Sequence, residues 1–130
     1  MKLPEELQFM ANARLPQHRT QARLDGRVCV ITGATSGVGY QAARRLAQGG
    51  AEIVLVCRNP QKGEAVRQEL TESFGVKVDI VLADFTDLDA VRRAADEILT
   101  RYPRIDALVN NAGVHRTHRT LTEAGFETVF

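Results

Sequence analysis

The chain has 130 residues, of which 44% are hydrophobic and 25% charged, the composition of an ordinary globular domain. Its formal net charge of +1 gives no reason to expect a nucleic acid or an acidic membrane surface as a partner. The sequence has no apolar run near the roughly 18 residues of a membrane-spanning helix, and its first residues lack the apolar centre of a secretory signal.

Two cysteines, Cys29 and Cys57, both fall in stretches that we expect to be buried strands. In such places cysteines serve as small hydrophobic residues, and not as a disulfide or a metal pair. This usage favours a reducing compartment, so the expected location is cytoplasmic.

Residues 1–23 are predicted to be an N-terminal extension, and residues 24–130 to be the folded domain. A short helix that opens at Pro4 is one interpretation of the extension, with one side formed by Leu7, Met10 and Arg14. A loosely attached, irregular segment is the other interpretation, and it is the one that we favour.

A β-branched run from Val28 to Ile31 breaks into a loop with glycines at positions 33, 37 and 39, and an amphipathic helix follows. Gly33 permits a tight turn off the strand, while Gly37 and Gly39 let the backbone approach a pyrophosphate or a neighbouring strand. The first turn of the helix offers unpaired N–H groups to phosphate oxygens. The pattern predicts an anion-binding loop; the alternative is a structural loop in which the glycines are incidental.

Strands and helices alternate through the rest of the chain. Further strands are predicted by the apolar runs at 53–57 and 107–110 and by a weak alternation at 76–82. Asn59 and Pro60 predict the start of a helix that ends at about Ser73, and Gly49-Gly50 predicts a left-handed stop for the first helix.

The last helix is predicted to open at a capping box formed by Thr86 to Asp89. Its inward residues, taken from their helical spacing, are Leu88, Val91, Ala95, Ile98 and Tyr102.

The helical connections are long enough for right-handed crossovers between parallel strands. We therefore expect an α/β fold: a Rossmann-type, doubly wound parallel sheet in the strand order 3-2-1-4, partial in that a C-terminal half is lacking. Ligands bind such sheets beyond the carboxyl ends of the strands, where the order reverses between strands 1 and 4.

Two motifs carry a family resemblance. Thr32 to Gly39 follows the pattern Thr-Gly-x-x-x-Gly-x-Gly, and the fourth strand ends in Asn-Asn-Ala-Gly at 110–113. Together they resemble the short-chain dehydrogenase/reductase family, and residues 55–59, 84–85 and 121–127 look most like its retinol-dehydrogenase-like branch. The resemblance covers residues 24–130 and implies an NADP-dependent oxidoreductase that interconverts an alcohol and a carbonyl by hydride transfer.

The strand ends predict one cofactor site. An acid normally holds the ribose hydroxyls some 20 residues beyond the glycine loop, but here Cys57 and Arg58 stand at that place. A guanidinium pairs well with a phosphate, which favours NADP over NAD; the alternative is a solvated arginine at a helix start. The resemblance implies that Asp84 meets the adenine edge. The predicted cofactor-binding residues are Thr32, Gly33, Ala34, Thr35, Ser36, Gly37, Val38, Gly39, Arg58, Asp84, Phe85, Asn111, Ala112 and Gly113.

No catalytic residue can be assigned in this chain. The family transfers its proton with a Tyr-x-x-x-Lys pair, but Tyr40 is followed four residues later by Arg44, and Tyr102 by Asp106. No metal ligand is predicted either, since the histidines of the Arg-rich loop, His115 and His118, and helix carboxylates such as Glu69 are expected to be solvated.

We interpret the chain as the cofactor-binding N-terminal part of a dehydrogenase, inactive alone, whose complete form acts on a small-molecule alcohol or carbonyl. The fourth strand would then be an unprotected sheet edge, so association of copies into a homo-oligomer is an expectation. Two alternatives stay open: a non-catalytic nucleotide-binding module or sensor, and a degraded product without stable activity.

Overall fold

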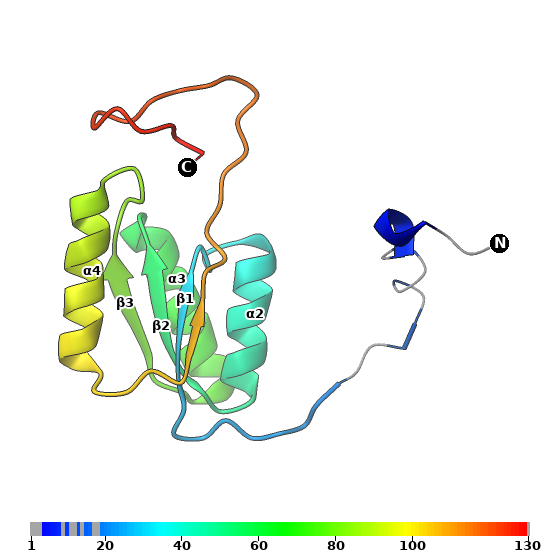
Figure 1. The fold of residues 1–130 in the computed structure, drawn as a ribbon. Coiled ribbons are helices and arrows are strands. Elements are labelled where there is room, and N and C mark those ends of the chain that lie inside the picture. Colours follow the sequence, from blue (N-terminus) through cyan, green and yellow to red (C-terminus); the bar gives the residue numbers. More distant parts are fainter. Residues whose placement is uncertain (1–3, 9, 11–12, 14, 17–18, 130) are drawn as a thin grey trace.

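The structure, a computed structural model, describes residues 4–8, 10, 13, 15–16 and 19–129 (Figure 1). Within them a short 3-10 helix, η1 (Glu5–Leu7), precedes an alternation of strands and helices. The elements are β1 (Val28–Thr32), α2 (Gly37–Gln48), β2 (Glu52–Cys57), α3 (Pro60–Phe74), β3 (Val78–Leu82), α4 (Leu88–Arg101) and β4 (Ala107–Val109). No described helix is long and apolar enough to cross a lipid bilayer. The helical side predicted for the extension includes Arg14, which lies outside the described residues.

All strand pairs are parallel, and the order β3-β2-β1-β4 confirms the prediction. The central strand β2 is buried from Ile53 to Cys57, as a strand covered on both faces should be. Because the order reverses between β1 and β4, the switch point of this doubly wound sheet lies between those two strands.

Two hydrophobic layers cover the two faces of the sheet, with α2 and α3 on one face and α4 on the other (Figure 1). Alternate residues of each strand point to opposite faces, so Ile31 packs with the α2 residue Ala43 while Val30 packs with the α4 residue Ile98. The small side chains Ala43 and Ala47 let α2 lie close to the sheet, and both are fully buried.

The stop and start signals around α2 and α3 act as predicted. The left-handed residue after α2 is Gly50, with φ of 97°, and not Gly49, which stays in the right-handed region. Asn59 caps α3, because its side chain accepts a hydrogen bond from the Lys62 N–H at 2.9 Å, and Pro60 is the first helical residue.

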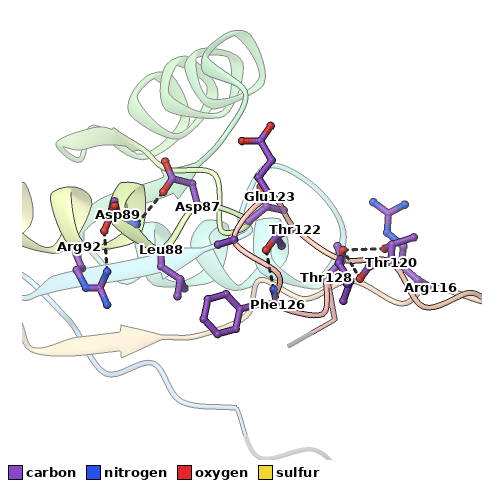
Figure 2. A pocket seen from close by; sticks show the side chains of 13 residues that line it. Asp87, Leu88, Asp89, Arg92, Arg116, Thr120, Thr122, Glu123, Phe126 and Thr128 are labelled. Atoms are coloured by element: carbon purple, nitrogen blue, oxygen red, sulfur yellow. Dashed lines mark hydrogen bonds and ion pairs between the residues drawn. The ribbon is translucent and has the colours of Figure 1, made fainter.

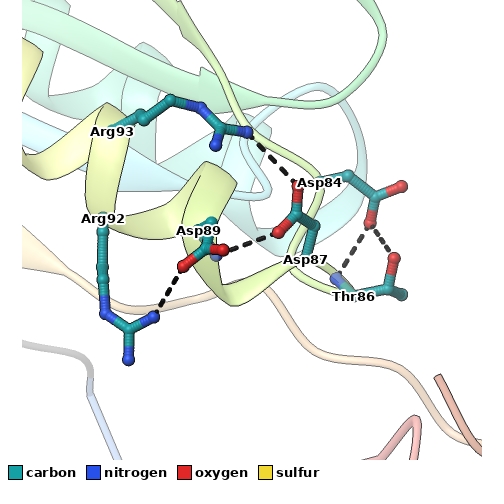
Figure 3. Close-up of polar contacts among 6 residues, drawn as sticks. All are labelled: Asp84, Thr86, Asp87, Asp89, Arg92 and Arg93. Atoms are coloured by element: carbon teal, nitrogen blue, oxygen red, sulfur yellow. Dashed lines mark hydrogen bonds and ion pairs between the residues drawn. The ribbon is translucent and has the colours of Figure 1, made fainter. Parts of the chain in front are cut away.

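The predicted cap of α4 was wrong by one residue. Asp87 is the N-cap, and its Oδ1 accepts a hydrogen bond from the Asp89 N–H at 2.9 Å (Figure 3). Thr86 does not cap the helix, since its hydroxyl donates to Asp84 Oδ1 at 2.7 Å in the turn that leaves β3. The side chain of Thr86, which the capping pattern assigned to the helix, therefore stabilises the turn before it.

The buried stripe of α4 also differs from the expected one. Ala94, Ile98 and Tyr102 are buried, whereas Ala95 and Leu88 are exposed. The buried residues follow one another every fourth position. Ile98 and Tyr102 are therefore buried as predicted, and the prediction was wrong at Leu88 and at Ala95, whose place in the stripe Ala94 takes.

The segment that enters the domain lies against the end of α2. Arg45 donates from its guanidinium to the Thr20 carbonyl at 2.6 Å, and the Leu24 N–H donates to the Gly49 carbonyl at 2.8 Å. The chain from Thr20 onward therefore contacts the domain before β1 begins.

At the amino ends of the strands, Asp106 fastens β4 to β1. Its Oδ2 accepts from the Val28 N–H at 2.9 Å, and its Oδ1 accepts from Arg27 at 2.8 Å and also from Arg104. These bonds, that with Arg27 above all, hold the pKa of the Asp106 carboxyl far below its usual range.

We predict that this contact makes the fold sensitive to acid. A depressed carboxyl pKa contributes stability that is complete above the unfolded value of about 4 and is lost as the pH falls below it. Asp106→Asn should lower the thermal midpoint of unfolding by several degrees at neutral pH, as measured by circular dichroism. The midpoint of this variant should also decrease less than that of the native chain when the pH is lowered into the acid range. Asp96→Asn, on the exposed face of α4, is the control, and an equal shift in both variants would contradict the assignment.

The β4 edge is open in the described chain, and its central residue Leu108 is 60% exposed. Unpaired edge groups beside an apolar side chain favour pairing with another strand. We predict concentration-dependent association in light scattering, and Leu108→Lys should reduce it. A monodisperse monomer with a concentration-independent melt would contradict this prediction.

Candidate cofactor-binding site

The loop after β1 closes tightly onto the end of β4, and two glycines make that approach possible. Gly33 has φ of 67°, and a Cβ placed on it would lie 2.8 Å from the Ala112 Cα. A Cβ on Gly39 would lie 2.3 Å from the Asn111 Nδ2 and 2.4 Å from the Gly33 carbonyl oxygen. Each distance is too short for a real contact, so both positions require glycine.

Asn111 and Thr32 fix this closure by hydrogen bonds. The Asn111 Nδ2 donates to the carbonyls of Thr32 at 3.2 Å and Gly33 at 3.1 Å. The Thr32 hydroxyl accepts from the backbone N–H groups of Asn111 at 3.1 Å and Ala112 at 2.9 Å. The asparagine amide thus bridges neighbouring strand ends, as its motif implies.

The N-terminus of α2 is open toward solvent. Its N-cap Ser36 makes no side-chain capping bond, in contrast to the caps of α3 and α4. Gly37 has φ of 59°, and a Cβ placed on it would meet no atom within 4 Å. Uncapped N–H groups with the positive end of the helix dipole above free space form a site for an anion.

A second part of the site lies at the ends of β2 and β3. Asp84 Oδ1 accepts from the Thr86 N–H at 2.9 Å and from its hydroxyl (Figure 3). These two bonds, and to a smaller extent the nearby charge of Arg58, lower the pKa of the Asp84 carboxyl. Arg58 itself is exposed and makes no hydrogen bond or ion pair with the described residues, so its donors are available to a ligand. Phe85, beside Asp84, is 46% exposed.

Not all of the predicted residues present a side chain at this edge. Ala34 is 1% exposed in the core and Thr32 is 6% exposed with its hydroxyl bonded to β4, so these two residues shape the loop. Gly113 has space around it, since a Cβ there would meet only the Asn111 carbonyl oxygen at 4.0 Å. The site residues thus divide into those that build the loop and those that face open space.

Sequence reasoning missed a cavity beside the predicted site. It has a volume of about 810 Å³ and lies between the start of α4 and residues 116–128 (Figure 2). Leu88 and Phe126 line it with four threonine hydroxyls, and the charged groups of its lining are Asp87, Asp89, Arg92, Arg116 and Glu123. No local sequence pattern predicts this cavity, because the two segments that line it are more than 20 residues apart in the sequence.

The hydroxyl groups of both tyrosines are already engaged by other side chains. Tyr102 is 5% exposed at the amino ends of the strands, where its hydroxyl contacts Asp79 and lies 3.4 Å from the Lys77 Nζ. Burial above all raises its pKa well beyond the usual range, the opposite of what proton transfer requires. The Tyr40 hydroxyl donates to Glu69 at 3.1 Å, so Glu69 joins α2 to α3 and is not merely solvated. No metal-binding group of side chains occurs among the described residues.

An open glycine loop, an uncapped helix N-terminus and a switch point between β1 and β4 are features of the α/β folds that bind nucleotides. The family model for short chain dehydrogenases matches residues 27–130, and the chain belongs to that family.

Curated relatives agree with this family. DnrU of Streptomyces sp., proposed to be a daunorubicin C-13 ketoreductase, is 43% identical over 113 residues, which cover 86% of this chain and 39% of that protein. Human retinol dehydrogenase 13 is 37% identical over 112 residues, which cover 85% of this chain and 34% of the relative. The chain therefore spans between about a third and two fifths of the length of these relatives.

Solved structures show the same architecture. L-sorbose reductase from Gluconobacter frateurii, complexed with NADPH and L-sorbose, superposes with a TM-score of 0.70 at 35% identity, covering 82% of this chain and 40% of that one. A short chain dehydrogenase structure from Shigella flexneri, complexed with NADP, gives a TM-score of 0.67 at 31% identity over 73% of this chain and 41% of that one.

Proposed function

We propose that this chain supplies the cofactor-binding part of an NADP-dependent oxidoreductase that interconverts an alcohol and a carbonyl. The observation that carries the proposal is the uncapped N-terminus of α2 over open space at Gly37, held in place by the close contact of Gly39 with Asn111. A pyrophosphate fits this cradle, because backbone N–H groups and a helix dipole both favour an anion there.

The preference for NADP over NAD rests on Arg58. It stands at the end of β2, where an enzyme selective for NAD carries an acid, and its guanidinium is free to pair with a phosphate. Asp84 lies close enough to Arg58 for the charge of the arginine to lower the pKa of its carboxyl. Only one oxygen of that carboxyl is bonded to Thr86, so the other is free for the adenosine part of the cofactor. The NADPH and NADP complexes of the related structures support the same assignment.

The residues of this chain bind and orient the cofactor, and the bound cofactor supplies the hydride. Gly33 and Gly39 let the loop close onto the end of β4, and Gly37 keeps the space in front of the helix N-terminus open for a dinucleotide, while Ser36 and Thr35 add hydroxyls at the open loop. Ala112 and Gly113 are small residues at the switch point, so a flat ring can approach β4 closely.

Titration with NADPH, followed by its fluorescence, tests the proposal on the chain itself. We expect saturable binding that adenosine bisphosphate displaces. Lack of any binding by a chain that circular dichroism shows to be folded would refute the cofactor assignment.

We predict that the chain alone catalyses no hydride transfer to any carbonyl. Tyr40 is bonded to Glu69, and Tyr102 is buried at the opposite end of the strands with a raised pKa, so neither is placed to move a proton at the site. NADPH absorbance should stay constant with aldehydes or ketones present. Substrate-dependent oxidation that Tyr40→Phe abolishes would reveal a different catalytic site.

The mass of the native protein separates this proposal from a non-catalytic nucleotide-binding module. A mass above the 14.3 kDa of these residues, with a Tyr-x-x-x-Lys pair in the additional sequence, supports the oxidoreductase. A native mass of 14.3 kDa with NADPH binding supports the module. We also propose a cytoplasmic location, because Cys29 and Cys57 are buried free thiols whose pKa is raised by burial.

A further inference from the structure

The chain leaves β4 as an extended strap that crosses the carboxyl edge of the sheet. Residues 114–119 have no regular hydrogen-bonded structure, and Figure 1 shows them arching from β4 toward the side of β3 and α4. A small hairpin follows, closed by the Leu121–Glu127 bridge and by the Thr128 N–H, which donates to the Thr120 carbonyl at 2.8 Å. The cavity shared with α4 places this hairpin beside the start of that helix.

The strap carries an unusual density of cationic and titratable groups. His115, Arg116, His118 and Arg119 fall within five residues, and all are exposed. Arg119 approaches one carboxylate, Glu127, at 3.9 Å. Arg116 has no ion pair or hydrogen bond with any residue that the structure describes. A chain of net charge +1 thus concentrates positive charge on one short segment.

Two arginines near the start of α4, of which Arg92 lines the cavity, behave differently. Arg92 lies 2.8 Å from Asp89 and Arg93 lies 3.3 Å from Asp87, so both pairs are already neutralised (Figure 3). Glu123, on the hairpin, is the remaining carboxylate of the lining, and it forms no ion pair with Arg116 (Figure 2). Arg116 is therefore the arginine of this cavity whose charge no neighbouring carboxylate satisfies.

The position of Arg116 in the sequence places its charge near the proposed cofactor site. Arg116 follows Gly113 by three residues, and three extended residues span at most about 11 Å. A ligand held against Asn111 and Gly113 therefore lies within reach of a guanidinium that folds back from the strap. Guanidinium groups bind phosphates and carboxylates through paired, charge-assisted hydrogen bonds.

We propose that the strap is an anion-binding clamp, in which Arg116, assisted by Arg119, contacts an anionic group of the ligand held at the carboxyl edge of the sheet. This inference rests on the proposed function, since that function supplies the ligand. The anionic group is a phosphate of NADPH or a carboxylate or phosphate of the substrate. In either case the strap orders over the bound ligand.

Limited trypsin digestion of the whole chain tests the clamp, because trypsin cleaves after Arg116 and Arg119. Cleavage after Arg19, in the extension, provides the internal control. If the anion belongs to the cofactor, NADPH alone should slow cleavage of the strap about tenfold and leave cleavage after Arg19 unchanged. If it belongs to the substrate, NADPH with carboxybenzaldehyde should protect the strap, and NADPH alone or with benzaldehyde should not.

Variants complete the test. Arg116→Gln should weaken the protecting ligand about tenfold or more by fluorescence or calorimetry. Arg67→Gln, which removes an arginine paired with Glu64 on α3, should change that affinity less than twofold. NADPH binding without strap protection by any of these probes, or an unchanged affinity in Arg116→Gln, would overturn the clamp and leave the proposed function standing. If the folded chain binds no NADPH, the proposed function fails and the clamp fails with it.

Discussion

Gly39→Ala is expected to destabilise the chain by about 3 kcal/mol, the upper part of the range for overpacking, and to abolish NADPH binding. The new Cβ would lie 2.4 Å from the Gly33 carbonyl oxygen and 2.3 Å from the Asn111 amide nitrogen. The first is a backbone atom, and the second is held by two hydrogen bonds, so neither moves aside cheaply. Relief would require the loop after β1 to separate from β4, and that loop is the proposed pyrophosphate cradle. Urea unfolding and NADPH fluorescence measure the two effects.

Gly75→Ala is the matched control for the same added methyl group. Gly75 ends α3 in the left-handed region, with φ of 66°, and a Cβ there would meet nothing within 4 Å. Its cost is therefore backbone strain alone, about 1–2 kcal/mol, with NADPH affinity unchanged. If Gly39→Ala behaved like Gly75→Ala in both measurements, the close approach to Asn111 would not be what shapes the site.

Topology was predictable because each of its causes is local. The apolar run of β2, the caps at Asn59 and Pro60 and the glycine loop after β1 each define one boundary, and the alternation then allows few arrangements. The observed order β3-β2-β1-β4 follows from connections long enough for parallel crossovers.

The errors arose where two local patterns competed or where distant residues meet. Thr86 fits the pattern of a capping box, but its hydroxyl donates a hydrogen bond to Asp84 instead, and Asp87 is the N-cap of α4. Ala94 and Ala95 are indistinguishable in sequence, and only the packing of α4 on the sheet selects Ala94 as the buried one.

Contacts between residues far apart in the sequence could not be predicted either. Tyr102 has no lysine four residues later, but the fold brings the Lys77 Nζ to 3.4 Å from its hydroxyl. That contact lies at the amino ends of the strands, beside Asp79, and it stabilises the fold there. The cavity between α4 and residues 116–128 likewise depends on how the strap crosses the sheet.

Arg58→Ala should weaken NADPH binding by about 1.5–3 kcal/mol, roughly tenfold to 150-fold, and leave NADH binding nearly unchanged. The two cofactors differ by one phosphate, and Arg58 is the exposed, unpaired guanidinium at the end of β2 among the described residues. Its removal costs NADPH a charged hydrogen-bond partner, while NADH has no group at that position to lose.

The NADPH affinity that a second variant of Arg58 loses shows whether the charge of the arginine or the geometry of its donors selects the additional phosphate of NADPH. Arg58→Lys keeps the positive charge but not the planar donor pair, so it should retain part of the preference and lie between the native chain and Arg58→Ala. Raising the salt concentration should narrow the difference between the cofactors in the native chain, because an exposed charge pair is screened. Arg67→Ala, which removes another exposed arginine, from α3, should leave both affinities unchanged. Equal affinities of the native chain for NADPH and NADH, or an undiminished preference in Arg58→Ala, would show that Arg58 is a solvated residue at a helix start and that another group reads the ribose.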